Sequence, residues 1–152
     1  MLPFDAYQDA GRKAGVRLKG EVTRREDAPR LIKYSNSHHC GYCGLCLTDS
    51  FERWRLITID HVVPKALCEQ LKLDPEWIDD FCNCVLACSA CNGYQQKRDE
   101  LLDLARGNSS KTWDNFLILR NKFFENRKRW ILEKRRDEME FFVSRPWESA
   151  KL

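Results

Sequence analysis

The sequence lacks a long apolar run, an export signal and a large excess of either charge. No apolar stretch approaches the roughly 18 residues that a membrane span needs, so we expect no membrane association. Residues 1–7 contain no basic segment followed by an apolar one, so we expect reduced thiols and a soluble, cytoplasmic protein. The net charge of +3 does not by itself indicate a nucleic-acid partner.

The composition is typical of a folded globular protein. A hydrophobic fraction of 43%, with five Trp and eight Phe, supplies bulky material for a core. A length of 152 residues fits one compact core with added arms. We divide the chain into an N-terminal arm that is helical or irregular (1–36), a core (37–107) and a basic amphipathic C-terminal helix (108–152).

Four of the eight cysteines form two matched pairs. Cys40 and Cys43 are separated by two residues, and so are Cys88 and Cys91. Two such knuckles typically hold one tetrahedral zinc, because each presents two thiolates from one tight turn. Four sulfurs leave no position for water, so this zinc would be structural. Cys46 leaves a second pairing with Cys43 open.

The remaining cysteines carry no comparable signal. They are Cys46, Cys68, Cys82 and Cys84. No two of them have the spacing of a knuckle, so buried thiols are favoured over a second zinc site.

Four short motifs surround the knuckles in a fixed order. They are Cys40-Gly-Tyr-Cys43, Ile59-Asp60-His61-Val-Val-Pro64, Asn83-Cys-Val-Leu-Ala-Cys88 and Cys91-Asn92-Gly-Tyr. Residues 40–97 thereby resemble the zinc-containing HNH endonucleases, whose core is a ββα-metal (His-Me) finger. The resemblance implies an α+β fold with a structural zinc on four cysteines and with flanking helices. The tyrosine and glycine around Cys43 match the family knuckle, which assigns the zinc to the two pairs named above and leaves Cys46 out.

The resemblance also implies a metal-dependent endonuclease that hydrolyses phosphodiester bonds in DNA, with DNA favoured over RNA. His61 would be the general base, since an unperturbed imidazole is largely neutral near pH 7. Asp60 and Asn92 would bind a catalytic cation, and their hard oxygen donors suit Mg²⁺ or Mn²⁺. Asn83 would orient His61 or pin its loop. The alternatives are a structural carboxylate for Asp60, a helix cap for Asn92 and a turn-capping amide for Asn83.

The expected secondary structure places these residues on two strands and a helix. Residues 55–60 and 81–87 should be strands, and residues 92–105 should be a helix closed by Gly107. Successive strand residues face opposite sides, so the first strand must end or bulge for Asp60 and His61 to serve one site. Asp74 and Pro75 have the signature of a helix start.

The last third of the chain has the pattern of one long helix that Ser110 or Thr112 caps and Arg145-Pro146 ends. Its apolar residues recur mostly at helical spacing: Trp113, Phe116, Leu117, Phe123, Phe124, Trp130, Ile131, Phe141 and Phe142. We expect them to pack against the finger, a second copy or a protein partner, with base stacking as the alternative. A basic face with Arg127, Lys128, Arg129, Lys134, Arg135 and Arg136 could follow a phosphate backbone or simply be solvated.

Two other functions remain open. One is a zinc-stabilised nucleic-acid-binding module without catalysis, which would need the cysteines but neither Asp60 nor His61. The other is a nuclease subunit of a defence or phage complex that is silent until a partner engages the aromatic helix.

Overall fold

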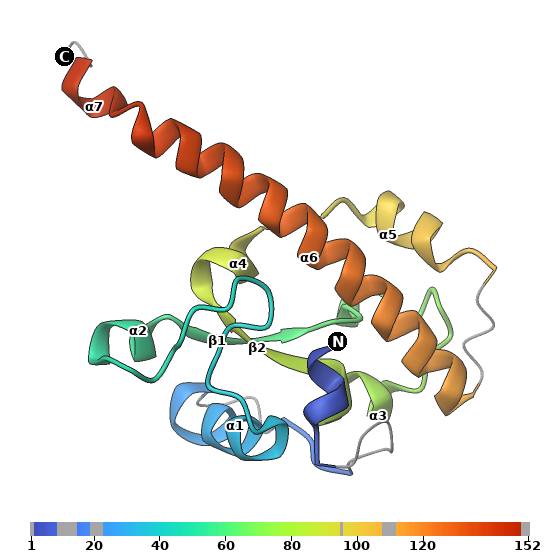
Figure 1. The fold of residues 1–152 in the computed structure, drawn as a ribbon. Helices are drawn as coiled ribbons and strands as arrows, with labels where there is room; N and C mark the ends of the chain where they lie inside the picture. The colour runs from blue at the N-terminus through green and yellow to red at the C-terminus, as the bar shows by residue number, and fades with distance from the viewer. Residues whose placement is uncertain (1, 9–14, 19–22, 95, 108–111, 150–152) are drawn as a thin grey trace.

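The fold is a mixed α+β arrangement in which helices surround a small two-stranded sheet (Figure 1). This computed structural model describes residues 2–8, 15–18, 23–94, 96–107 and 112–149. The N-terminal elements are η1 (Pro3–Ala6), η2 (Thr23–Asp27), α1 (Ala28–Ser35) and α2 (Phe51–Arg55). The central elements are β1 (Ile57–His61), η3 (Lys65–Leu67), α3 (Pro75–Ile78), η4 (Phe81–Asn83), β2 (Cys84–Cys88) and α4 (Ser89–Gly93). The C-terminal helices are α5 (Arg98–Ala105), α6 (Trp113–Val143) and α7 (Pro146–Ser149).

The sheet consists of β1 and β2, which pair antiparallel with Ile57 opposite Cys88 and His61 opposite Cys84. The strand predicted over residues 55–60 is confirmed as β1, which begins two residues later than predicted. The second begins three residues later than predicted, because Asp80 caps the turn of η4 by accepting a hydrogen bond from the backbone N–H of Cys82 at 2.8 Å. The helix α4 follows β2 directly, which completes the ββα order expected for the finger.

The predicted helix over residues 92–105 is wrong, since the chain forms two helices, α4 and α5, in this region. Tyr94, at the end of α4, has an extended backbone with ψ of 112°. Its ring packs edge-on against Trp130 of α6 with 6.0 Å between the centroids. This tertiary contact accompanies the break and overrides the local helical pattern.

The predicted starts of two other helices are confirmed. Asp74 Oδ1 accepts a hydrogen bond from the N–H of Glu76 at 2.9 Å, with Pro75 in the first turn of α3. Thr112 caps α6 and accepts from the N–H of Asn115 at 3.3 Å, whereas Ser110 lies outside the described residues. These caps satisfy amide groups that have no partner inside the helix.

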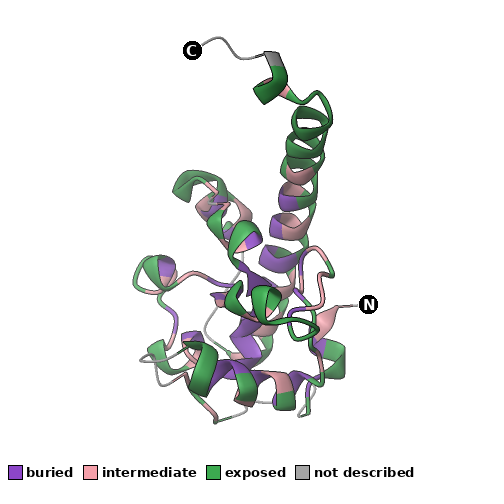
Figure 2. Cartoon of the chain, turned by 90° about the vertical axis from the view of Figure 1, so that its left-hand side faces the viewer, coloured by how far each residue is buried: buried purple, intermediate pink, exposed green. Residues whose placement is uncertain are grey.

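The long helix α6 is buried along its first half and projects from the body of the molecule along its second (Figures 1 and 2). Phe116, Phe123 and Phe124 are fully buried, so packing against the finger is confirmed for this half. Phe141 and Phe142 are instead more than 60% exposed. For them, docking of a second copy or a partner stays a prediction.

One hydrophobic core draws on all three segments into which we divided the chain. Phe124 of α6 packs edge-on against Phe4, with 5.3 Å between the centroids, and stacks on Tyr42 at 5.4 Å. Tyr7 donates a hydrogen bond from its hydroxyl to the carbonyl of Cys84 at 2.6 Å. The arm and the C-terminal helix therefore stabilise the sheet and the first knuckle. None of the helices in the described part of the chain combines the length and apolar character that crossing a bilayer requires.

Candidate active site

Four cysteine side chains meet beside the sheet. The Sγ atoms of Cys40, Cys43, Cys88 and Cys91 all lie within 4.8 Å of one another. The first knuckle lies against β2, where the N–H of Gly41 donates to the carbonyl of Leu86 at 2.8 Å. In the second knuckle, the N–H of Cys91 donates to Cys88 Sγ at 3.5 Å. This is the group of ligands that the resemblance predicted, and Cys46 is not part of it.

The cysteine group has the chemistry of a metal site. Hydrogen bonds from Cys88 and Cys91 lower the pKa of Cys40, while the hydrogen bonds to Cys40 raise the pKa of Cys88 and Cys91, so one thiolate is favoured in the group. Four thiolates are a donor set for a tetrahedral, closed site. Arg135 of α6 also faces this group. Although burial opposes it, the charges of the nearby Cys43, Cys91 and Cys88 raise the pKa of Arg135, which can offset the negative charge of four thiolates.

His61 ends β1 and its ring contacts a carboxylate. The Nε2 atom lies 3.0 Å from Oδ1 of Asp79, and the same oxygen lies 2.6 Å from Nζ of Lys65. Because an ionised carboxylate only accepts hydrogen bonds, Nε2 carries the proton of the neutral ring and Nδ1 keeps its lone pair. Burial lowers the pKa of His61, while the hydrogen bond to Asp79 opposes this shift. The imidazole is therefore predominantly neutral at pH 7, as a general base requires.

Asp60 lies on the same strand, buried against α6. Its carboxylate accepts a hydrogen bond from the Tyr42 hydroxyl. It also forms an ion pair with Arg127, in which Nε lies 3.2 Å from Oδ2 without the alignment of a hydrogen bond. Burial raises the pKa of Asp60, whereas Arg127 and the Tyr42 hydroxyl lower it. Arg127 is thus the cation that partners this carboxylate.

Asn92 lies in α4 and shares Arg127 with Asp60. Its Oδ1 accepts from Nη2 of Arg127 at 3.4 Å, so one guanidinium contacts both predicted cation ligands. Cys88, and not Asn92, is the N-cap residue of α4, so the alternative role of Asn92 as a cap is wrong. Two hard oxygen donors that face one positive charge fit a divalent cation. Such a cation would compete with Arg127 for these oxygens.

Asn83 is completely buried below the loop that follows His61. Its Oδ1 accepts from the N–H of Val63 at 2.9 Å, and its Nδ2 donates to the carbonyls of Val63 and Ile78 at 3.0 and 2.9 Å. Its own carbonyl accepts from the N–H of Val62 at 2.8 Å. These bonds favour pinning of the loop over direct orientation of the His61 ring.

The strand does not bulge at these residues. Asp60 and His61 pair in regular register with Val85 and Cys84, and β1 ends directly after His61. The strand thus ends at this point, which is one of the two expected ways to bring Asp60 and His61 to one site, and the shared site stays a prediction. The structure joins Asp60 to Asn92 through Arg127, and it joins His61 to Asp79.

The sequence reasoning missed Asp79, and it placed Arg127 on a basic face that would follow a phosphate backbone or be solvated, whereas Arg127 is buried. A signal for Arg127 was present, because it lies midway between Phe123 and Ile131 at helical spacings of four. A charged residue at a core position of a helix needs a buried partner. Asp79 carries no such signal, since it follows a short helix at the surface.

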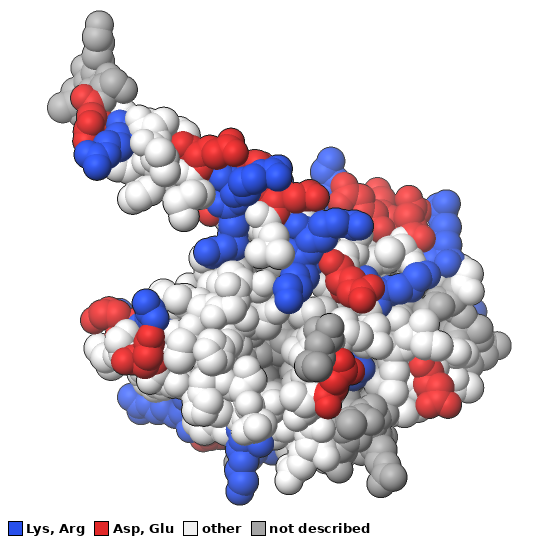
Figure 3. Space-filling view, in the orientation of Figure 1, with Lys and Arg blue, Asp and Glu red and all other residues white. Residues whose placement is uncertain are grey.

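The basic face of α6 is only partly a charged surface. Arg127 is buried, whereas Arg129, Lys134 and Arg136 are exposed. Figure 3 shows the Lys and Arg side chains over the middle of this helix with acidic side chains between them. One of the contacts is an exposed pair between Lys134 and Asp137 at 3.8 Å. This mixture reduces the field that a phosphate backbone would meet.

The strand pair, the helix after it and the four cysteines define a small ββα finger with a group of thiols that could bind a metal ion. Residues 40–98 match the family model described as HNH endonuclease, which supports an HNH assignment for this part of the chain. At the level of the family, this indicates a nuclease that acts on nucleic acids with a divalent metal. No curated protein and no solved structure matched the chain.

Proposed function

We propose that the protein is a metal-dependent endonuclease that hydrolyses phosphodiester bonds in DNA. The observation that carries the proposal is the His61 ring, which Asp79 fixes through Nε2 at the end of β1. This bond leaves Nδ1 as the basic atom, on the strand that also provides Asp60. The family match over residues 40–98 supports the choice of phosphodiester as the bond attacked.

In this mechanism, Nδ1 of His61 takes a proton from a water molecule as the water attacks phosphorus. Asp79 holds the ring and stabilises the imidazolium that forms. Asn83 fixes the loop after His61 and so keeps the imidazole in place. A Mg²⁺ or Mn²⁺ ion on Asp60 and Asn92 would supply positive charge for the phosphate and the leaving 3′ oxygen. The zinc on the four cysteines would have a structural role only.

A plasmid-nicking assay in Mg²⁺ or Mn²⁺ tests this function. The purified protein should nick the plasmid, and His61→Ala should lower the rate by about 100-fold or more, because a general base contributes this much. His39→Ala is the matched control, since His39 is exposed and distant from the catalytic groups in sequence. Equal rates for the protein and His61→Ala would remove His61 from the mechanism.

A second candidate is a nucleic-acid-binding module without catalysis. The observation that favours it is Arg127, which by itself partners both Asp60 and Asn92. In this case, DNA would be bound and would stay intact after long incubation with Mg²⁺ or Mn²⁺. Cleavage that His61→Ala abolishes would exclude it.

The outer end of the long helix supports the predicted partner contact. The exposed apolar residues there are Met139, Phe141, Phe142 and Val143 of α6 and Trp147 of α7. A second copy or a protein partner would bury them, and the latter would fit a nuclease subunit of a larger complex. Molecular mass in solution, measured with and without DNA, distinguishes a homodimer from a monomer whose exposed apolar residues would bind a different protein.

A further inference from the structure

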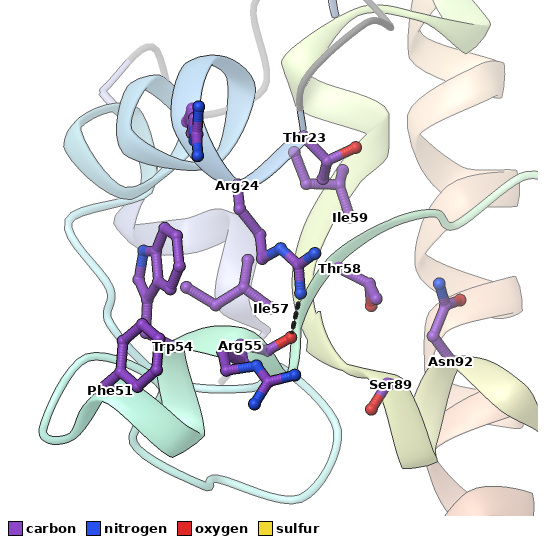
Figure 4. Close-up of a pocket in the computed structure, with 11 residues that line it drawn as sticks. Thr23, Arg24, Phe51, Trp54, Arg55, Ile57, Thr58, Ile59, Ser89 and Asn92 are labelled. Carbon is purple, nitrogen blue, oxygen red and sulfur yellow. Dashed lines mark hydrogen bonds between the residues drawn. The ribbon is translucent and has the colours of Figure 1, made fainter.

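An open pocket of about 810 Å³ lies against β1 on the side of α2 and η2. Figure 4 shows Ile57, Thr58 and Ile59 of β1 at its centre, with α4 on one side and α2 on the other. The lining residues that matter for binding are Arg24, Arg25, Arg55, Phe51, Trp54 and Asn92. Its size is within the range of pockets that bind small ligands or single units of a polymer.

The pocket has a positive wall. Arg24, Arg25 and Arg55 line it, and no acidic side chain of the described residues does. The guanidinium of Arg24 donates to the carbonyl of Arg55 and lies 5.9 Å from the centroid of Trp54. Arg55 has a single acidic contact in the described residues, an exposed one to Glu52 at 3.8 Å. Guanidinium groups in such an open arrangement suit phosphate oxygens, which they can bind with two parallel hydrogen bonds.

The pocket also has an aromatic wall. The rings of Phe51 and Trp54 stack with 6.0 Å between the centroids and 19° between the planes. Phe51 is 67% exposed, so the fold gains little from burying it. Arg55 lies 5.9 Å from the Phe51 ring, which leaves the aromatic pair next to a cation. Exposed aromatic rings beside arginines are a surface on which nucleobases stack.

The pocket reaches the candidate active site through Asn92. This residue lines the pocket, and its Oδ1 contacts the guanidinium that also pairs with Asp60. A strand whose phosphates lie on the three arginines would therefore pass beside Asn92, which shares Arg127 with the buried Asp60.

We infer that the pocket binds an unpaired stretch of the nucleic-acid strand next to the bond that is cut. Phosphates bind Arg24, Arg25 and Arg55, and a base stacks on Phe51. A base inside a duplex is already stacked on its neighbours, so only an unpaired base can use this ring. The substrate is then single-stranded or locally opened, which the HNH match does not specify. The choice of ligand rests on the proposed nuclease function.

Fluorescence anisotropy tests the inference on a labelled single strand of about 12 nucleotides and on a duplex of the same sequence. The protein carries His61→Ala, and no divalent metal is added, so binding is measured without cleavage. The single strand should bind more tightly than the duplex. Phe51→Ala should weaken single-strand binding about tenfold, because one base loses its stacking partner. Phe51→Tyr, which keeps a ring, should bind normally.

A second pair of variants tests the phosphate contacts. Arg24→Ala combined with Arg55→Ala should weaken binding and reduce the slope of log affinity against log salt by about 1.4, since each lost phosphate contact on a single strand contributes about 0.7. Arg53→Ala is the control. Arg53 lies on α2 with Arg55, but it pairs with Asp49 and does not line the pocket.

The outcomes separate this inference from the proposed catalysis. The pocket assignment would be overturned if the protein bound the duplex more tightly than the single strand. Equal single-strand affinities for Phe51→Ala and Phe51→Tyr would also overturn it, even if the protein cleaves DNA. Selective single-strand binding that depends on Phe51 would support it, even if the protein fails to nick DNA.

Discussion

At the scale of single residues, Asp79 and Lys65 shift the pKa of the proposed base, His61, in opposite directions. Asp79 raises the pKa of His61, and the positive charge of Lys65 lowers it. The net shift is downward, because burial is the largest influence. A base must be neutral to act, so activity should fall as the pH drops through the lowered pKa of the folded protein.

Replacing the carboxylate tests this balance. Asp79→Asn removes an influence that raises the pKa of His61, so the acid limb of the pH profile of kcat/KM should move to lower pH. The plateau should also fall, because the ring loses the partner that orients it. Lys65→Gln should move the acid limb to higher pH. Shifts of both variants in the same direction would contradict the assignment of His61 as the titrating base.

The residues that could be predicted from the sequence are those whose function depends on close neighbours. The cysteine ligands belong to this class, since each pair lies in one turn. The contacts of His61 with Asp79 and of Asn92 with Arg127 span 18 and 35 positions in the sequence. No local pattern encodes such pairs, so the sequence could suggest His61 and Asn92 but not the side chains that hold them.

At the scale of elements, the loop between β1 and η3 depends on Asn83. We expect Asn83→Ala to lower the free energy of unfolding by about 3 kcal/mol, because its side chain makes three buried hydrogen bonds at about 1 kcal/mol each. Urea unfolding measures this change. Asn115→Ala is the control, since Asn115 is half-buried in the first turn of α6, and a shift within about 0.5 kcal/mol is expected there. An equal decrease in the free energy of unfolding for the two variants would contradict the role of Asn83 in holding the loop.

Some elements could be predicted because local sequence determines them, whereas others depend on contacts between residues far apart in the chain. The strand β1 and the caps at Asp74 and Thr112 follow from β-branched residues and from cap chemistry, which act over a few positions. The break between α4 and α5 occurs where Tyr94 packs on Trp130, which is far away in the sequence. A pattern of helical residues cannot include this contact, and the prediction of one helix failed for that reason.

At the scale of the whole molecule, the four cysteines join two knuckles that are 45 residues apart between Cys43 and Cys88. The purified protein should contain about one zinc per chain. Cys91→Ser should lose most of this zinc and unfold at a clearly lower temperature, because metal binding is coupled to folding. Metal analysis and thermal unfolding measure both effects.

Cys46→Ser provides the matched control, since Cys46 follows the first knuckle but lies outside the cluster. It should keep its zinc and its unfolding temperature. A loss of zinc equal to that of Cys91→Ser would reassign the ligands to the Cys43 and Cys46 pair.

The contacts of α6 with the finger affect how the chain can be shortened. Phe124 covers Tyr42, and Arg127 neutralises Asp60. A fragment that stopped at residue 98 would bare the aromatic ring of Tyr42 to water and leave a carboxylate in an apolar setting without its counter-charge. We therefore expect that residues 40–98 do not fold alone, and that an autonomous fragment must extend at least through the buried half of α6.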